Sequence, residues 1–169
     1  MEQIVQLKSN AKLSEHFTLG EFTKSGSHPE VYNIPSHEAI ENMKRLCIWL
    51  EELRKRASPG PSKGRGEPII INSGYRSPQL NKKIGGVPTS NHLTGCAVDI
   101  RVSGMEQLIR YAAILLDISN ETHQDFDELL IEKRSASPLG SSKNRHGAIW
   151  LHFAVRPSHN RRKVSLIQA

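Results

Sequence analysis

The stretch Ser90-Asn91-His92-Leu93-Thr94-Gly95-Cys96-Ala97-Val98-Asp99 is the most informative part of this chain. It places the imidazole of His92 seven residues before the carboxylate of Asp99, and a strand-like run follows at residues 100–102. A second imidazole, His152, lies far downstream in the apolar segment 149–155. Two neutral histidines and one carboxylate are a ligand set of open catalytic zinc sites, where water takes the fourth position. The residues therefore predict one zinc ion per chain, bound by His92, Asp99 and His152.

The segment 149–155 has the alternation of a β-strand, in which successive side chains point to opposite faces. One face is expected to join the core, and it carries Ile149, Leu151, Phe153 and Val155. Trp150 and His152 then point the other way, toward a cleft. The same alternation in residues 96–101 separates Cys96 from Asp99, so Cys96 is not expected to bind metal. An uncompensated charge at Asp99 would be costly in such an apolar strand, and a bound cation removes that cost.

Two further motifs precede this region. Residues 73–77 read Ser-Gly-Tyr-Arg-Ser, and residues 81–88 read Asn-Lys-Lys-Ile-Gly-Gly-Val-Pro. With residues 90–99 and Trp150-Leu151-His152, they make the chain resemble the zinc D-Ala-D-Ala carboxypeptidase family of peptidoglycan hydrolases. That family reads S-G-Y-R-S, then S-x-H-x-x-G-x-A-x-D, then W-[IVL]-H. The resemblance spans residues 13–156, and its opening segment 13–22 is common in one branch of the family.

The resemblance implies a fold and an activity. The expected fold is a single α+β domain of the Hedgehog/DD-peptidase type, a small and mostly antiparallel sheet with helices packed on one side. This domain is assigned to residues 13–156, between an N-terminal extension, 1–12, and a basic C-terminal tail, 157–169. The implied activity is hydrolysis of a peptidoglycan stem peptide or muropeptide, by a D-Ala-D-Ala carboxypeptidase or an endolysin-like endopeptidase.

Three residues are candidates for contacts with the substrate. Arg76 follows a strand and a glycine turn, and its planar guanidinium suits a substrate carboxylate. Ser90 lies two residues before His92, where it either binds substrate or caps the turn. Trp150 shares the open face of its strand with His152.

The general base departs from the family pattern. A zinc peptidase needs a group that takes a proton from water and passes it to the leaving amine. Relatives often have an acidic residue three positions before the last histidine, but Ile149 stands there in this chain. Glu132, at the end of the predicted neighbouring strand, is the first candidate, and His146 is the second.

The coarse layout supports this fold. Thr18 with Glu21 fits a helix capping box, and Ser36 can cap a helix that reaches Arg56 with apolar residues at helical spacing. Further helices are expected at 78–84 and 105–116, and strands at 68–72, 97–102, 126–132 and 148–155. Residues 57–66 and 134–147 have loop composition, and the second is expected to be mobile.

Composition sets outer bounds. A chain of 169 residues is one domain by the usual prior. Its formal charge of +6 favours anionic partners without choosing among nucleic acid, anionic membranes and the bacterial wall. No apolar run reaches the roughly 18 residues of a membrane span. The first eight residues lack the pattern of a signal peptide. The chain is therefore expected to be a cytoplasmic monomer as encoded, acting on the wall after release or on muropeptides in the cytoplasm.

Two other functions remain open. The first is a non-catalytic binding module that keeps the fold and the zinc, as in the signalling domain of Hedgehog proteins; the missing acid at Ile149 favours it. The second is nucleic-acid binding, prompted by Arg65, Arg134, Lys143, Arg145 and the segment 156–163. No zinc finger, helix-turn-helix or ribonucleoprotein motif supports nucleic-acid binding, and no nucleic-acid partner is expected.

Overall fold

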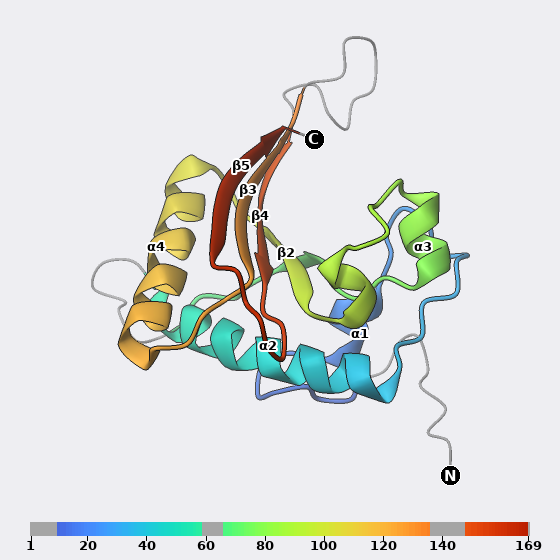
Figure 1. The fold of residues 1–169 in the computed structure, drawn as a ribbon, viewed down its shortest axis with the longest axis horizontal. Coiled ribbons are helices and arrows are strands. Elements are labelled where there is room, and N and C mark those ends of the chain that lie inside the picture. The colour runs from blue at the N-terminus through green and yellow to red at the C-terminus, as the bar shows by residue number, and fades with distance from the viewer. Residues whose placement is uncertain (1–9, 59–65, 136–147, 169) are drawn as a thin grey trace.

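A five-stranded sheet organises the chain, whose computed structural model describes residues 10–58, 66–135 and 148–168. The strand order is β1-β2-β4-β3-β5. The helices are α1 (Leu19–Thr23), α2 (His37–Arg56), α3 (Pro78–Lys83) and α4 (Met105–Thr122), with a 3₁₀ turn, η2, at Asn91–Thr94. The strands are β1 (Ile71–Ser73), β2 (Ala97–Arg101), β3 (Glu128–Arg134), β4 (Ala148–Ala154) and β5 (Lys163–Gln168). Figure 1 shows α4 and α3 on opposite sides of the sheet.

The sheet is mostly antiparallel, which confirms the predicted α+β class. β1 pairs with β2, β2 with β4 and β4 with β3, all antiparallel, whereas β5 runs parallel to β3. In this register Asp99 lies opposite His152, and His152 lies opposite Leu130. These three residues form one row across the sheet. The row brings Asp99 and His152 together although 53 residues separate them in the sequence.

The C-terminal segment differs from its expected role as a basic tail. Residues Lys163–Gln168 form β5, which pairs with β3 along its length. The segment was expected to be a tail because it begins with several basic residues. Its apolar residues Val164, Leu166 and Ile167, however, are typical of a strand. Pairing with β3 is a long-range contact that local charge cannot predict. The segment therefore belongs to the sheet and helps to line its open face.

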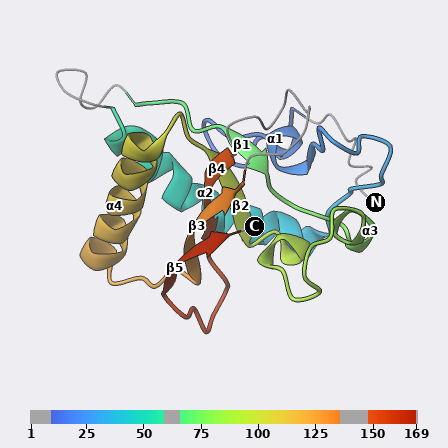
Figure 2. The ribbon, with the colours of Figure 1, turned by 90° about the horizontal axis from the view of Figure 1, so that it is seen from above.

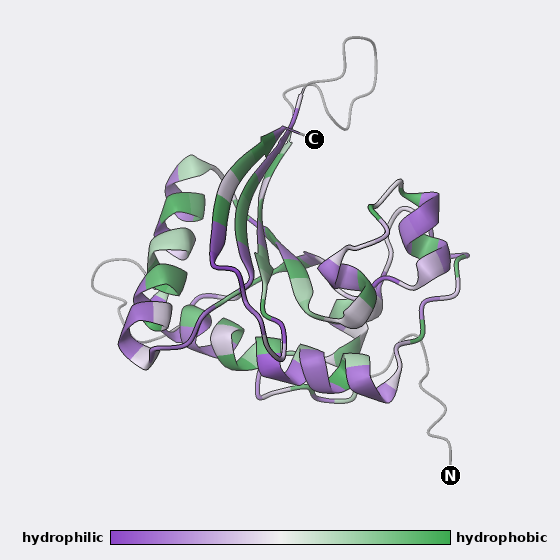
Figure 3. Cartoon of the chain, viewed as in Figure 1, coloured by the Kyte–Doolittle hydropathy of each residue, from purple (hydrophilic) through white to green (hydrophobic). Residues whose placement is uncertain are grey.

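Helices α2 and α4 pack on one face of the sheet, as predicted (Figures 1 and 2). Ser36 begins α2 by accepting a hydrogen bond from the backbone N–H of Ala39 at 3.1 Å, as the sequence indicates. The apolar face of each helix then meets the core face of the strands, where Figure 3 shows hydrophobic segments in green. The buried core includes Met43, Leu46, Leu50, Leu53, Val98, Ile100, Leu108, Tyr111, Leu115, Leu129, Leu151, Phe153 and Val155.

Several bounds differ from the expectations. α4 continues to Thr122, beyond the expected end at Leu116, because Ile118 and Ser119 remain buried on its inner face. β3 is displaced by two residues toward the C-terminus, and β1 is shorter than residues 68–72 suggest. Residues 1–9, 59–65 and most of the expected mobile loop lie outside the described residues. No helix in the described part of the chain is long and apolar enough to cross a membrane.

The turn between η2 and β2 depends on Gly95. Its φ is +74°, and an added Cβ would lie 2.5 Å from the backbone oxygen of Ala39 in α2. Gly85 has a similar φ of +75°, but a Cβ there would meet nothing within 4 Å. A substitution at Gly85 would therefore meet backbone strain alone, whereas a substitution at Gly95 would meet the same strain and a steric clash with α2.

We expect Gly95→Ala to lower the free energy of unfolding by more than the roughly 1–2 kcal/mol that a left-handed backbone costs. Gly85→Ala should lower it by about that conformational cost alone. Urea unfolding followed by circular dichroism measures both values. Equal losses in the two variants would show that contact with α2 does not constrain this turn.

Candidate metal centre

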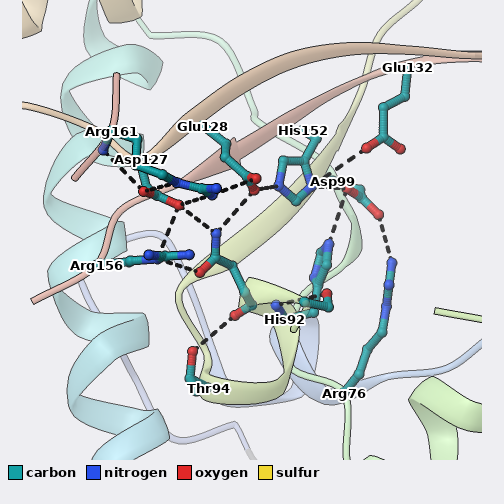
Figure 4. A network of polar contacts seen from close by, with 12 residues as sticks. Arg76, His92, Thr94, Asp99, Asp127, Glu128, Glu132, His152, Arg156 and Arg161 are labelled. Carbon is teal, nitrogen blue, oxygen red and sulfur yellow. Dashed lines mark hydrogen bonds and ion pairs between the residues drawn. The ribbon is translucent and has the colours of Figure 1, made fainter. Parts of the chain in front are cut away.

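Three potential ligands converge on the open face of the sheet (Figure 4). His92 comes from η2, Asp99 from β2 and His152 from β4, and each offers a ligand atom within 4.8 Å of the other two. Oδ1 of Asp99 lies 3.3 Å from Nε2 of His92 and 3.0 Å from Nδ1 of His152. All three residues are buried. The structure thus brings together the His-Asp-His set that the sequence singles out.

The outer partners of the two histidines select which nitrogen faces Asp99. Nδ1 of His92 is 2.6 Å from the carbonyl oxygen of Gly74, which only accepts, so this nitrogen donates and leaves Nε2 for the centre. Nε2 of His152 is 2.9 Å from Oε2 of Glu128, an acceptor as well, which leaves Nδ1 for the centre. Histidines that bind metals commonly donate their other N–H to a carbonyl or carboxylate. Both rings therefore have the orientation that a shared cation requires.

The charges around the centre also fit a cation. Burial lowers the pKa of His92, which favours its neutral form. Burial opposes the charge of Asp99, but His92 and His152 outweigh it and hold the pKa of Asp99 below its usual range. Burial likewise lowers the pKa of His152, yet its hydrogen bonds with Asp99 and Glu128 raise that pKa to about 9. A neutral histidine and an ionised carboxylate are forms that bind zinc, and the carboxylates around His152 favour a positive charge there.

Behind His152, a polar network fixes Glu128. Asn91 donates to Oδ2 of Asp127 at 2.8 Å and to Oε2 of Glu128 at 3.0 Å. Arg161 binds both carboxyl oxygens of Asp127, at 2.9 and 2.8 Å, and Oε1 of Glu128 at 2.8 Å. Arg156 donates to Oδ1 of Asn91 at 3.0 Å. The hydrogen bond with His152 is the main cause that lowers the pKa of Glu128 to about 2, so this carboxylate stays ionised.

Sequence reasoning missed this network as a support of the site. The sequence pattern that could have indicated it is the alternation in β3, where Glu128, Leu130 and Glu132 point to one face and Leu129 and Ile131 to the other. Leu129 belongs to the core cluster, which places the acidic residues on the opposite, open face. The register that sets Glu128 beside His152 was not readable from that pattern.

Glu132 lies on the other side of His152 from Glu128. Its Oε1 is 4.0 Å from Nδ1 of His152, the nitrogen that faces Asp99. Burial, followed by the charge of Asp99, raises the pKa of Glu132. The structure therefore places this candidate base beside the three potential ligands. Its role stays a prediction, and the second candidate, His146, lies outside the described residues.

Arg76 is held against the centre. Its Nη2 donates to Oδ2 of Asp99 at 3.0 Å, and its Nε donates to Oγ of Ser73 at 3.1 Å. Ser90 begins η2, and its Oγ accepts from the backbone N–H of His92 at 3.3 Å. The ring of Trp150 lies 5.7 Å from the guanidinium carbon of Arg134. Substrate contacts by Arg76, Ser90 and Trp150 stay predictions.

Cys96 takes no part in the ligand set. It is buried, burial raises the pKa of its thiol, and its Sγ donates to the carbonyl oxygen of Thr94 at 3.9 Å. Among the described residues, the group able to hold a metal is His92, Asp99 and His152.

Two cavities meet at this centre. One has a volume of 530 Å³ and reaches Lys24, Arg134 and Trp150. The other has a volume of 690 Å³ and reaches Ser90, Glu128 and Lys163. Three residues line both cavities: Arg76, Asp99 and Glu132. Each volume lies within the range of roughly 300–1,000 Å³ that is common for small-molecule sites.

The fold and the site define a zinc peptidase. The family model described as Peptidase M15 matches residues 15–119, which include Arg76, His92 and Asp99. The chain belongs to the peptidase M15 family, whose members are zinc-dependent metallopeptidases. The match ends before β3 and β4. The place of His152, Glu128 and Glu132 in the site is therefore inferred from the structure and the sequence pattern, and not from the family match. No curated protein matches the chain.

We expect the purified protein to bind about one equivalent of zinc. His152→Ala removes a potential ligand and should lose most of that zinc, whereas Glu128→Gln should weaken affinity about 10- to 100-fold because it removes only the outer carboxylate. Metal analysis and competition with a chromogenic chelator measure both effects.

Asp117→Asn is the matched control, because this exposed carboxylate lies on α4, away from the centre. It should bind zinc like the unmodified protein. Full retention of zinc by His152→Ala would remove this histidine from the ligand set.

Proposed function

We propose that this M15 peptidase hydrolyses peptidoglycan stem peptides or muropeptides at a bond next to a D-amino acid. The observation that carries the peptidase chemistry is the position of Glu132. Its carboxylate approaches the nitrogen of His152 that faces Asp99, inside the region where the two cavities meet. The substrate class is supported by the motifs at residues 73–77, 90–99 and 150–152, which resemble those of peptidoglycan carboxypeptidases.

Three side chains are proposed to hold zinc: Nε2 of His92, Nδ1 of His152 and the carboxylate of Asp99. When bound, zinc polarises a carbonyl and makes water more acidic. Arg76 keeps the second oxygen of Asp99 in place through its hydrogen bond at 3.0 Å. Glu128 orients His152 from behind, at 2.9 Å. These contacts hold the side chains of Asp99 and His152 in the orientation for zinc before substrate binds.

Glu132 is proposed to move the proton. Its carboxylate accepts a proton from the attacking water and passes it to the nitrogen of the leaving amine. A carboxylate whose pKa is raised takes a proton from water more readily than an ordinary carboxylate, and burial and Asp99 raise the pKa of Glu132. Ile149, which replaces the usual acid, cannot do this, and it packs against the core.

Substrate contacts are assigned to the walls of the cavities. Arg76 offers the rest of its guanidinium to a substrate carboxylate or carbonyl, since only Nε and Nη2 bond to Ser73 and Asp99. Ser90 lines the larger cavity and Trp150 the smaller one. The indole gives a flat apolar surface beside the polar centre.

A non-catalytic binding module of the same fold is the alternative, favoured by Ile149 at the position where relatives have an acid. It predicts zinc and ligand binding without hydrolysis. The presence of Glu132 beside the centre favours the enzyme.

We expect Glu132→Gln to lower kcat about 10²- to 10⁴-fold, because the amide keeps the shape but cannot accept the proton. Zinc content should not change. Glu128→Gln is the matched variant on the same strand face, and it should act first on zinc affinity. If Glu132→Gln stays active while His146→Ala does not, the histidine is the base.

Digestion of purified peptidoglycan tests the proposed substrate. The protein should release peptide fragments that mass spectrometry identifies, and a chelator should stop the release until zinc is restored. Binding to the wall without hydrolysis in any zinc-loaded sample would instead support the binding module.

A further inference from the structure

The strand β5 adds a row of side chains to the open face of the sheet, beside the metal centre. It runs parallel to β3 (Figure 1), and the register sets Lys163 opposite Glu128 and Ile167 opposite Glu132. Side chains that lie opposite each other on paired strands point to the same face. Lys163 and Ile167 therefore share the face of the two glutamates, and both line the larger cavity. The family match ends at residue 119, so it does not cover this strand.

The larger cavity changes from polar to apolar along β5. At one end, Lys163 lies opposite Glu128, whose Oε1 accepts a hydrogen bond from Arg161 at 2.8 Å. Four residues further, roughly 13 Å along a strand that rises about 3.3 Å per residue, Ile167 lies opposite Glu132. The side chain of Ile167 is partly buried and lines the cavity. The apolar end is therefore the end that lies beside the proposed base.

Val87 forms a second apolar wall at this end. It lies on the turn that follows α3 and lines the larger cavity, whereas its neighbour Gly86 lines the smaller one. The turn therefore reaches the junction of the two cavities, which Glu132 also lines. The side chain of Val87 is 63% exposed, so its methyl groups are accessible to a ligand.

The buried amide of Asn81 holds this turn in place. Its Nδ2 donates to the carbonyl oxygen of Val87 at 3.0 Å, and the backbone N–H of Ser90 donates to the same oxygen at 3.1 Å. A Cβ at Gly86 would overlap Oδ1 of Asn81, so the turn packs closely against this side chain. A wall that is ordered before binding loses little conformational entropy when a ligand arrives. The motif at residues 81–88 thus presents Val87 to the cavity in a fixed position.

We propose that Val87 and Ile167 form an aliphatic subsite beside Glu132, which receives the methyl group of an alanine next to the cleaved bond. Leu130, which is 4% exposed and lines the same cavity, closes the subsite toward β4. An aliphatic side chain gains from contact with these walls, whereas a charged one would lose water without gaining a partner. This inference rests on the proposed function, because it assigns substrate selection to the same site.

The test uses zinc-loaded protein and N-acetylated peptidoglycan stem pentapeptides. Mass spectrometry first identifies the bond that is cut. Each alanine that flanks this bond is then replaced by glycine, which removes one methyl group. We expect one of these replacements to lower kcat/KM about tenfold or more, because one methylene in a hydrophobic pocket is worth roughly 10- to 200-fold.

Variants locate the subsite. Ile167→Ala and Val87→Ala should each reduce the preference for alanine over glycine at least about threefold, because each removes one wall. Ile167→Thr keeps the branched shape that suits a strand and should change the preference in the same direction. Zinc content should not change. A purely structural role would lower kcat/KM for both peptides equally and leave their ratio unchanged.

Leu166→Ala is the matched control. Leu166 is the neighbouring apolar residue of β5, 70% exposed, and it points to the opposite face with Ile131. This variant should keep the preference of the unmodified protein.

Three results decide the inference. Equal kcat/KM values for the alanine and glycine peptides in the unmodified protein, or a preference that Ile167→Ala and Val87→Ala leave intact, would overturn the subsite while the zinc peptidase stands. A cleaved bond with no alanine beside it would do the same. No chelator-sensitive hydrolysis of any of the peptides would overturn the proposed function and this inference together.

Discussion

The pairing of β2 with β4 is the constraint on which the rest of the site depends. It sets Asp99 opposite His152, so that a carboxylate and an imidazole from distant parts of the chain face the same point. Side chains alternate along a strand, and a slip of one residue would turn His152 into the core and Leu151 toward the cleft. The apolar face of β4 prevents that slip, because Leu151 and Phe153 are fully buried against α2 and α4. The hydrophobic core thus fixes the geometry of a polar centre.

A second constraint is the buried charge of Asp127. This carboxylate is fully buried, and its burial is compensated by the guanidinium of Arg161 and the amide of Asn91. Removing one partner of a buried pair commonly costs about 3–5 kcal/mol, since the other charge is left without compensation. The network therefore holds Asn91 rigidly next to His92 in the chain and holds Glu128 against His152. Stability and the orientation of the potential ligands depend on the same contacts.

The two glutamates of β3 illustrate how position separates chemical roles. Glu128 accepts a hydrogen bond from the outward nitrogen of His152, which keeps its pKa low, near 2. Glu132 lies two strand repeats further along β3, beside the inward nitrogen, where burial and Asp99 raise its pKa. One carboxylate is suited to stay ionised and orient a ligand, and the other to exchange a proton. Their environments, rather than their residue type, divide these tasks.

The sequence by itself determined the three potential ligands that the fold brings together, the class of fold and the main helices. Residues 90–99 and His152 form a recognisable pattern, and α2 and α4 follow from helical periodicity, which is a local property. Only the tertiary structure decided that residues 163–168 complete the sheet, that Glu128 supports His152, and that the cavities extend on both sides of Glu132. Strand order and register arise from contacts between distant segments, and such contacts leave little trace in the local pattern of residues.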